Sequence, residues 1–282
     1  MLIWAASRVS HPTDAPEGLR LLGLVWSTAL IAAEGINCSH ELLHRRSRPE
    51  RFLAHLLLVS VMYGHFVIEH ARGHHFTVAT PHDPATMRFG ESVYRFLPRT
   101  ILGGYKSAWR LEVTRLTRER APVWGPHNAM LRYAAGQAAF VVGFYTLFGI
   151  PGLLLFLFQA TVAIILLEQI NAIEHYGLER KAVADGYERV GPKHSWDAPH
   201  RVSSYLLFKL QVHADHHLHA SRRYQTLELT EGSPMLPAGY LTLAPILLVP
   251  PLWRAVMDPV LLAYRERWRA EEIAQANAAK KE

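Results

Sequence analysis

Cysteine is nearly absent from this sequence of 282 residues, because Cys38 is the only one. A single thiol excludes an internal disulfide and any metal site built from thiolates. A bound metal would therefore need nitrogen or oxygen ligands. The first ten residues, MLIWAASRVS, also lack the apolar core and cleavage site of a signal peptide. Internal repeats and low-complexity linkers are absent as well.

Acidic residues are outnumbered, with 24 Asp and Glu against 30 Lys and Arg, so the net charge is +6. A basic excess suits a nucleic acid, an anionic lipid surface or an acidic partner. Here the charges form short blocks beside apolar runs, and half of all residues are apolar. This patterning favours a membrane protein and argues against a nucleic-acid binder.

Several apolar runs bear on how the chain meets a bilayer. Residues 19–38 are long enough to cross as a helix. Residues 130–148 and 152–173 flank the sequence GIPG at 149–152, which predicts a tight turn between two spanning helices. Residues 237–253 contain four prolines, which predicts a broken or interfacial helix.

The distribution of basic residues predicts the orientation of these helices. Three basic blocks adjoin the apolar runs: Arg45, Arg46, Arg48 and Arg51; Arg110, Arg115, Arg118 and Arg120; Arg180, Lys181 and Arg189. The GIPG turn carries no basic residue, so the positive-inside rule places the three blocks in the cytoplasm. A docking role for these arginines is the weaker interpretation. The histidine-rich segments before and after residues 52–68 should share that side, so we expect this segment to be re-entrant or interfacial.

The expected fold class is therefore all-α, a polytopic integral-membrane helical bundle. One domain is predicted over residues 1–265. Residues 266–282, ERWRAEEIAQANAAKKE, predict a solvated C-terminal tail in helical form.

Histidine is abundant, with 17 copies, and the histidines cluster. The first box is HELLH, which contains His40 and His44. Residues at i and i+4 of a helix share a face, with Cβ atoms about 5–6 Å apart, so two imidazoles can bind one ion. The same letters also match the HExxH motif of zinc proteases, and a chance match is a third interpretation.

Two further boxes, EHARGHH and HADHH, each hold three histidines within a few residues. Their histidines are His70, His74 and His75 in the first, and His213, His216 and His217 in the second. An imidazole buried without partners loses its hydrogen bonds to water, which argues against a mere packing role. His175 in NAIEHYG stands alone, but it lies where the second helix of the pair returns to the cytoplasmic side, which favours its joining the others.

An acidic residue adjoins each cluster: Glu41, Glu69, Glu174 and Asp215. Imidazoles bound to a metal usually donate their second N–H to a carboxylate or a carbonyl. Three roles are open for these acids. They orient ligands on other segments, one of them bridges two metals, or they simply screen neighbouring positive charge.

Nine clustered histidines are too many for one ion, whereas two ions sharing them would fit. Zinc, copper, iron and nickel all accept imidazole, so the ligand type leaves the metal open. Boxes at the ends of membrane helices point to oxygen activation beside a lipid-soluble substrate. The other eight histidines are expected to be structural or solvated: His11, His55, His65, His82, His127, His194, His200 and His219.

Taken together, the boxes resemble the AlkB-type alkane 1-monooxygenases of bacteria. The family's HELxH, EHxxGHH, NxxEHYG and LQxHxDHH boxes correspond to HELLH, EHARGHH, NAIEHYG and LQVHADHH, in the same order. The stretches DPATMRFGESVYRFLPRT, GYKSAWRLE and SRRYQTLE are also similar to this family. The resemblance covers roughly residues 20–265 and is far more specific than HELLH alone.

The resemblance implies a multi-pass protein of the bacterial inner (cytoplasmic) membrane, with a fold like that of the fatty acid desaturases and hydroxylases. It implies a di-iron centre facing the cytoplasm, with nine histidine ligands: His40, His44, His70, His74, His75, His175, His213, His216 and His217. Its activity would be hydroxylation of n-alkanes by O2 to primary alcohols. Electrons would come from rubredoxin, reduced by an NAD(P)H-dependent rubredoxin reductase. Because the CxxC pairs of rubredoxin are absent here, that donor must be a separate protein.

One departure from the family concerns the N-terminus. Family members usually carry further membrane helices before the first box, whereas only residues 19–38 precede it here. We expect a chain shortened at its N-terminus, through fragmentation, a wrongly assigned start or a genuinely short form. The helices that are missing would line part of the substrate channel, so a catalytically inactive fragment is one alternative.

Several rival interpretations change the substrate or the function class. A xylene-type monooxygenase, or a fatty acyl desaturase or sterol-type hydroxylase, would use similar boxes, although the latter two usually lack EHxxGHH followed by NxxEHYG. A membrane zinc protease needs only three ligands and leaves six clustered histidines unexplained. A metal transporter should carry its histidines within the spans, whereas these lie mostly at helix ends.

Replacing a clustered histidine should have a different effect from replacing an isolated one. We expect His74→Ala or His216→Ala to abolish both activity and iron binding, because each removes a ligand. His127→Ala and His194→Ala should retain both. Activity assays together with iron analysis of the purified variants test this, and equal losses in all four would refute the ligand assignment.

Overall fold

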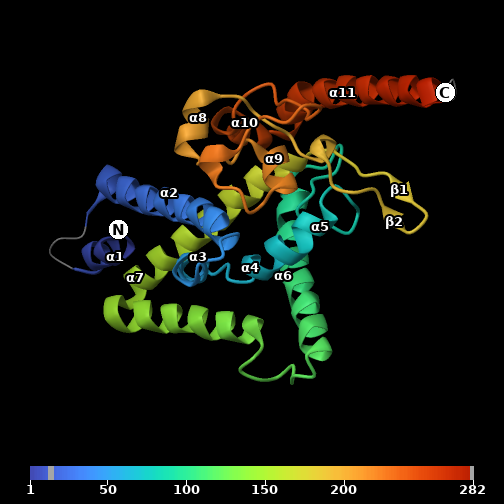
Figure 1. The fold of residues 1–282 in the computed structure, drawn as a ribbon. Helices are drawn as coiled ribbons and strands as arrows, with labels where there is room; N and C mark the ends of the chain where they lie inside the picture. The colour runs from blue at the N-terminus through green and yellow to red at the C-terminus, as the bar shows by residue number, and fades with distance from the viewer. Residues whose placement is uncertain (12–15, 280–282) are drawn as a thin grey trace. The chain divides into compact units, whose positions relative to one another are not determined.

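The computed structural model describes residues 1–11 and 16–279, and these are mostly helical. The described residues form two compact units, and the single domain expected over residues 1–265 stays a prediction. Unit 1 contains residues 1–77, 82–85 and 97–169, and unit 2 contains residues 78–81, 86–96 and those from 170 onward. The helices and strands of both units are labelled in Figure 1.

Unit 1 carries α1 (Leu2–Ser10), α2 (Gly18–Leu43), α3 (Arg48–Ser60), α4 (Phe66–Glu69), a π-helix (His70–His74), α5 (His75–Thr77) and most of α6 (Val93–Arg118) and α7 (Ala129–His175). Unit 2 carries β1 (Ala182–Val183), β2 (Gly186–Tyr187), a 3₁₀ turn (Pro192–His194), α8 (Arg201–Leu206), α9 (His213–Leu218), a second 3₁₀ turn (Tyr224–Thr226), α10 (Tyr240–Leu247) and α11 (Pro250–Ala279).

The turn predicted at GIPG divides α7 into two arms (Figure 1). Gly149 has φ 62° and ψ −161°, a conformation that is essentially restricted to glycine. The Ser10 hydroxyl donates a 2.6 Å hydrogen bond to the carbonyl of Phe148, which ties α1 to this turn. Among the described residues, α2 and α7 are the two helices long and apolar enough to cross a membrane.

The chain folds back on itself directly after α2. The Ser39 hydroxyl in α2 donates to the carbonyl of Ala54 in α3 at 2.9 Å, and a β-carbon at Gly35 would lie 3.6 Å from Leu57. The two helices are therefore antiparallel. With 13 residues, α3 is about 20 Å long, too short for a hydrocarbon core about 30 Å thick.

After α3 the chain turns at residues 61–65, and α4 and the π-helix return towards the C-terminal end of α2. The ring of His40 lies 4.4 Å from that of His70, and the ring of His44 lies 4.8 Å from that of His75, between centroids. The chain therefore reverses direction within residues 52–68. Its position relative to a bilayer stays a prediction.

Other elements agree with the sequence only in part. The proline-rich run at 237–253 is broken, as expected, into α10 and the start of α11. The helix α11 continues to Ala279, which gives the tail its expected helical form, and residues 280–282 lie outside the described residues. The antiparallel β1–β2 hairpin is a small exception to the all-α prediction. The sequence did not predict helix α6, because this polar helix contains no long apolar run.

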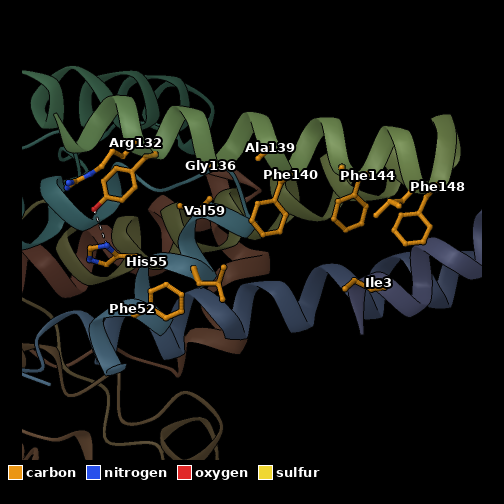
Figure 2. A pocket seen from close by; sticks show the side chains of 14 residues that line it. Ile3, Phe52, His55, Val59, Arg132, Gly136, Ala139, Phe140, Phe144 and Phe148 are labelled. Carbon is orange, nitrogen blue, oxygen red and sulfur yellow. Dashed lines mark hydrogen bonds between the residues drawn. The ribbon is translucent and has the colours of Figure 1, made fainter. Parts of the chain in front are cut away.

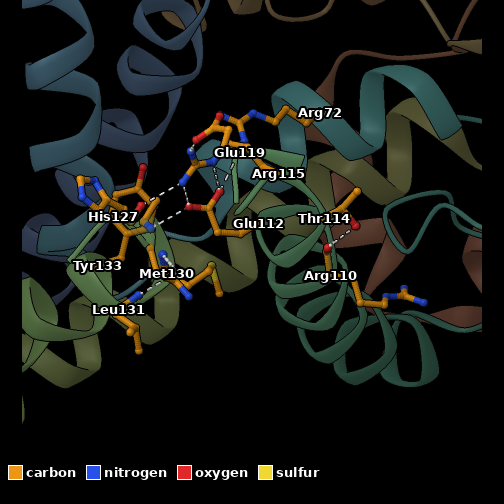
Figure 3. Close-up of polar contacts among 12 residues, drawn as sticks. Arg72, Arg110, Glu112, Thr114, Arg115, Glu119, His127, Met130, Leu131 and Tyr133 are labelled. Carbon is orange, nitrogen blue, oxygen red and sulfur yellow. Dashed lines mark hydrogen bonds and ion pairs between the residues drawn. The ribbon is translucent and has the colours of Figure 1, made fainter. Parts of the chain in front are cut away.

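A buried carboxylate joins α6 to α7 and to the π-helix. Glu112 is fully buried and accepts hydrogen bonds from the Arg115 guanidinium at 2.6 Å and the Ala129 N–H at 2.8 Å. Arg72 of the π-helix lies 3.5 Å from its second oxygen (Figure 3). Hydrogen bonding by Arg115 holds the pKa of Glu112 below its usual value. The start of α7 and the π-helix are thus fixed to one anion.

The turn at Gly149 generates a stability prediction. Gly149→Ala places a β-carbon on a backbone conformation that costs other residues about 1–3 kcal/mol. We expect a lower melting temperature for the detergent-solubilised protein in a thermal-unfolding assay. Gly143→Ala is the matched control, because Gly143 lies in the same arm and a β-carbon there meets nothing within 4 Å. Equal melting temperatures would contradict the requirement for glycine at the turn.

Candidate metal centre

Unit 1 brings together three imidazoles from two elements. His40 lies in the last turn of α2, His44 caps the C-terminal end of that helix, and His70 begins the π-helix. One ring nitrogen of each lies within 4.8 Å of those of the other two. Two of the predicted boxes therefore converge, and the i, i+4 spacing in α2 has the effect expected from sequence.

The second box differs from the expected α-helical geometry. Residues His70–His74 form a π-helix, in which the His75 N–H bonds to the His70 carbonyl five residues earlier. Each turn then holds more residues than an α-turn, so His75 lies opposite His70, with their Nε2 atoms 3.1 Å apart. His74 lies beside His70, with ring centroids 5.4 Å apart. Such π-turns are often found at functional sites.

His74 is oriented by a carboxylate that sequence reasoning missed. Its Nδ1 lies 3.0 Å from Oδ2 of Asp83, and both side chains are buried. Burial alone would lower the pKa of His74, but Asp83 raises it above its usual value. The Nδ1–H therefore donates to Asp83, so Nε2 is the nitrogen that would bind a metal. Asp83 lies in DPATMRFG, a stretch quoted for the resemblance, but it adjoins no histidine cluster.

Unit 2 holds a second convergent set. The Nε2 atom of His213 lies 3.2 Å from Nε2 of His175 and 3.0 Å from Nε2 of His217. The ring of His216 stacks on that of His213, with centroids 5.5 Å apart. His175 is brought here by the end of α7, which Gly177 terminates in the left-handed region at φ 67°.

Buried polar side chains support this second set. Oε2 of Glu174 lies 3.3 Å from Nε2 of His213, and its other oxygen accepts a 3.1 Å hydrogen bond from the Tyr240 hydroxyl. Asp197 accepts a hydrogen bond from the Ala214 N–H at 2.9 Å, which holds the first turn of α9. Burial raises the pKa of Asp197 above its usual value. Sequence reasoning found Glu174 and missed Asp197 and Tyr240.

The other acids named from the sequence have different surroundings. Glu41 forms an ion pair with Arg45, and Asp215 accepts from Arg222 at 2.9 Å and pairs with His219 at 2.7 Å. Both contacts fit the screening of neighbouring positive charge. Glu69 is buried, and this burial, followed by the nearby Asp83, raises its pKa.

The donor sets fit metal ions that accept imidazole. Burial lowers the pKa of His70 well below its usual value, and burial with the neighbouring Arg45 lowers that of His44 to about 4. Neutral imidazole is the form that binds metals. In each unit the ring nitrogens of several histidines face one another and give a preformed set of candidate ligands.

The remaining histidines have other partners or are exposed. His65 packs against Tyr63, and His194 is buried, with its Nε2 3.2 Å from Glu188. His127 is exposed. His127 is therefore the better negative control for ligand substitutions, since replacing the buried His194 would also disturb its hydrogen bonds.

The contact between His74 and Asp83 generates a prediction. Asp83→Asn preserves the volume but removes the charge that fixes the proton on Nδ1, so we expect metal affinity or activity to fall about 10–100-fold. Iron content by elemental analysis measures the effect, with thermal unfolding measured in parallel. Asp185→Asn, an exposed aspartate between β1 and β2, is the control. Equal iron content in the two variants would contradict the orienting role of Asp83.

Comparisons with known proteins agree with these boxes. The family model for fatty acid desaturases matches residues 19–246. Alkane 1-monooxygenase 2 of Pseudomonas aeruginosa is 42% identical over 94% of this chain and 70% of that protein, and alkane 1-monooxygenase 1 of the same organism is 44% identical over 93% and 69%. The hydroxylase component of xylene/toluene monooxygenase, XylM, of Pseudomonas putida is 29% identical over 93% and 71%. The chain therefore belongs to the fatty acid desaturase family and, within it, to the alkane 1-monooxygenases.

Proposed function

We propose that this protein is an alkane 1-monooxygenase that converts n-alkanes and O2 to primary alcohols at a centre of two iron ions. The observation that carries the proposal is the presence of two convergent sets of histidines, most of them buried, in a chain of this family. The nine ligands would be those expected from the sequence: His40, His44, His70, His74, His75, His175, His213, His216 and His217.

The residues of the chain have three tasks in this reaction. The clustered imidazoles would hold the metal. Asp83 keeps the proton of His74 on Nδ1, and Glu174 with Tyr240 restricts the position of His213. When bound, the irons would supply the reductive activation of O2 that attack on an unactivated C–H bond requires. The apolar helices α2 and α7 suit a protein that takes its substrate from the membrane.

The proposed electron donor is rubredoxin, itself reduced by an NAD(P)H-dependent reductase. Rubredoxins are acidic, and the exposed arginines Arg46, Arg48 and Arg51 follow the first histidine box. We place the histidine-rich side in the cytoplasm of a bacterium, with the protein in its inner membrane, because basic residues collect beside the boxes and not at the GIPG turn.

A xylene-type activity is the second candidate. Its support is the 29% identity to XylM, which extends over 93% of this chain. The greater identity to the alkane enzymes favours the first candidate.

Product analysis tests the proposal. Cells that express this chain with rubredoxin and its reductase are fed n-alkanes of several lengths and, separately, xylene, and the products are separated by gas chromatography. We expect primary alcohols from alkanes, and none from cells with the His216→Ala variant. Oxidation of xylene alone would favour the second candidate. No product from either, despite membrane-inserted protein that contains iron, would refute the proposed reaction.

A further inference from the structure

An apolar groove of about 810 Å³ opens within unit 1, away from the histidines assigned to the metal. Its walls are α1, α3 and the first arm of α7, and Figure 2 shows their side chains facing one another across it. Phe140, Phe144 and Phe148 line one wall at intervals of four residues, and Ile3 lies opposite them. The proposed alkane chemistry assigns no role to this groove.

The two ends of the groove differ in polarity. At the end near Phe148 the lining is apolar, whereas the other end carries His55, Tyr133 and Arg132. The Tyr133 hydroxyl and Nδ1 of His55 lie 3.4 Å apart (Figure 2). A purely apolar occupant, such as an alkane or a hydrophobic helix, has no polar or charged group that could interact with this end.

The polar end is also positively charged. Arg51 precedes His55 by one turn of α3, so the two side chains share a face of that helix. Arg132 lines the groove at the same end. Both arginines are exposed, and no acidic side chain is found among the described residues that line the groove. The two guanidinium groups, with no acidic residue in the lining, form a binding site for an anion at one end of the apolar groove.

The dimensions suit a single lipid chain. From Arg132 to Phe148 the lining extends about 24 Å along the helix at 1.5 Å per residue. This is more than the depth of one leaflet, which is about 15 Å if the hydrocarbon core is about 30 Å thick. The small residues Gly136, Ala139 and Gly143 leave space for an occupant along this wall. A β-carbon at Gly143 would meet no atom within 4 Å.

We propose that this groove binds one acyl chain of an anionic phospholipid, with the phosphate between Arg51 and Arg132 beside His55. The arginines contact the phosphate, and the phenylalanines of α7 pack along the chain. By the orientation proposed above, this lipid lies in the cytoplasmic leaflet, but the binding itself requires neither the metal nor the alkane reaction.

Native mass spectrometry of the full chain in detergent tests the proposal. Phosphatidylglycerol or phosphatidylcholine with identical acyl chains is titrated, and the affinity for the first bound lipid is measured. Two arginines near an anionic lipid should favour phosphatidylglycerol roughly 30-fold. We expect the double variant Arg51→Gln/Arg132→Gln to lose this preference. The control Arg110→Gln/Arg118→Gln, which removes two exposed arginines outside the groove, should keep it.

A second pair of variants tests the apolar part. Gly143→Leu should fill the groove and weaken the binding of both lipids about tenfold or more. Gly23→Leu is the matched control, since Gly23 is also helical, has nothing within 4 Å of its β-carbon and lies outside this groove. If Gly143→Leu fails to fold, the arginine variants decide alone.

Several outcomes would overturn the proposal. Equal affinity of the wild type for the two lipids would show that the groove does not select an anionic headgroup. An n-alkane that displaces the lipid at low concentration would identify an apolar occupant, if the arginine variants also keep the wild-type affinity for the lipid. A dimer that dissociates in Gly143→Leu, but not in Gly23→Leu, would assign the groove to a second copy of the chain.

Discussion

The burial of imidazole is the constraint on which the other features of this protein depend. Seven of the nine clustered histidines are buried. A polar group withdrawn from water needs a partner, because burial without one costs about 1–3 kcal/mol by mutational data. A metal bound by these imidazoles would take one nitrogen of each, and metal-bound imidazoles usually donate the second N–H to a carboxylate or a carbonyl. The pair His74–Asp83 already has that arrangement.

The local helix geometry determines which nitrogens meet. In α2 the ordinary α-helical spacing places His40 and His44 on one face, whereas the π-helix is needed for His70 and His75 to lie opposite each other. The π-turn is held from outside by Arg72 and Glu112. Because Glu112 also caps the start of α7, the same carboxylate serves the second box and the helix that carries His175 at its far end.

Features encoded in short, local patterns could be predicted, and features that depend on distant partners could not. The boxes, the GIPG turn and the broken helix at 237–253 each follow from a few consecutive residues. Asp83 and Asp197 were missed because their partners, His74 and the N–H of Ala214, are 9 and 17 residues away in sequence. The π-helix was missed because the i, i+4 rule assumes α-helical geometry. The helix α6 is polar and is held by Glu112 and its partners. It could therefore not be predicted from apolar periodicity. Glu41 adjoins a proposed ligand in sequence, and the structure pairs its carboxylate with Arg45.

The groove and the second histidine box share a structural support. Tyr133 and Val59 line the groove, and both pack with Ile68 of α4, immediately before the π-helix. Gly64 lies so close to Tyr133 that an added β-carbon would approach its ring to 2.9 Å. Densely packed interiors transmit small displacements, because few voids exist to absorb them. A lipid bound with its headgroup end beside Tyr133 would therefore restrict the same side chains that pack against Ile68 of α4. An empty groove would leave that support unfilled on one side, so the lipid would act as part of the packing that holds the second box in place.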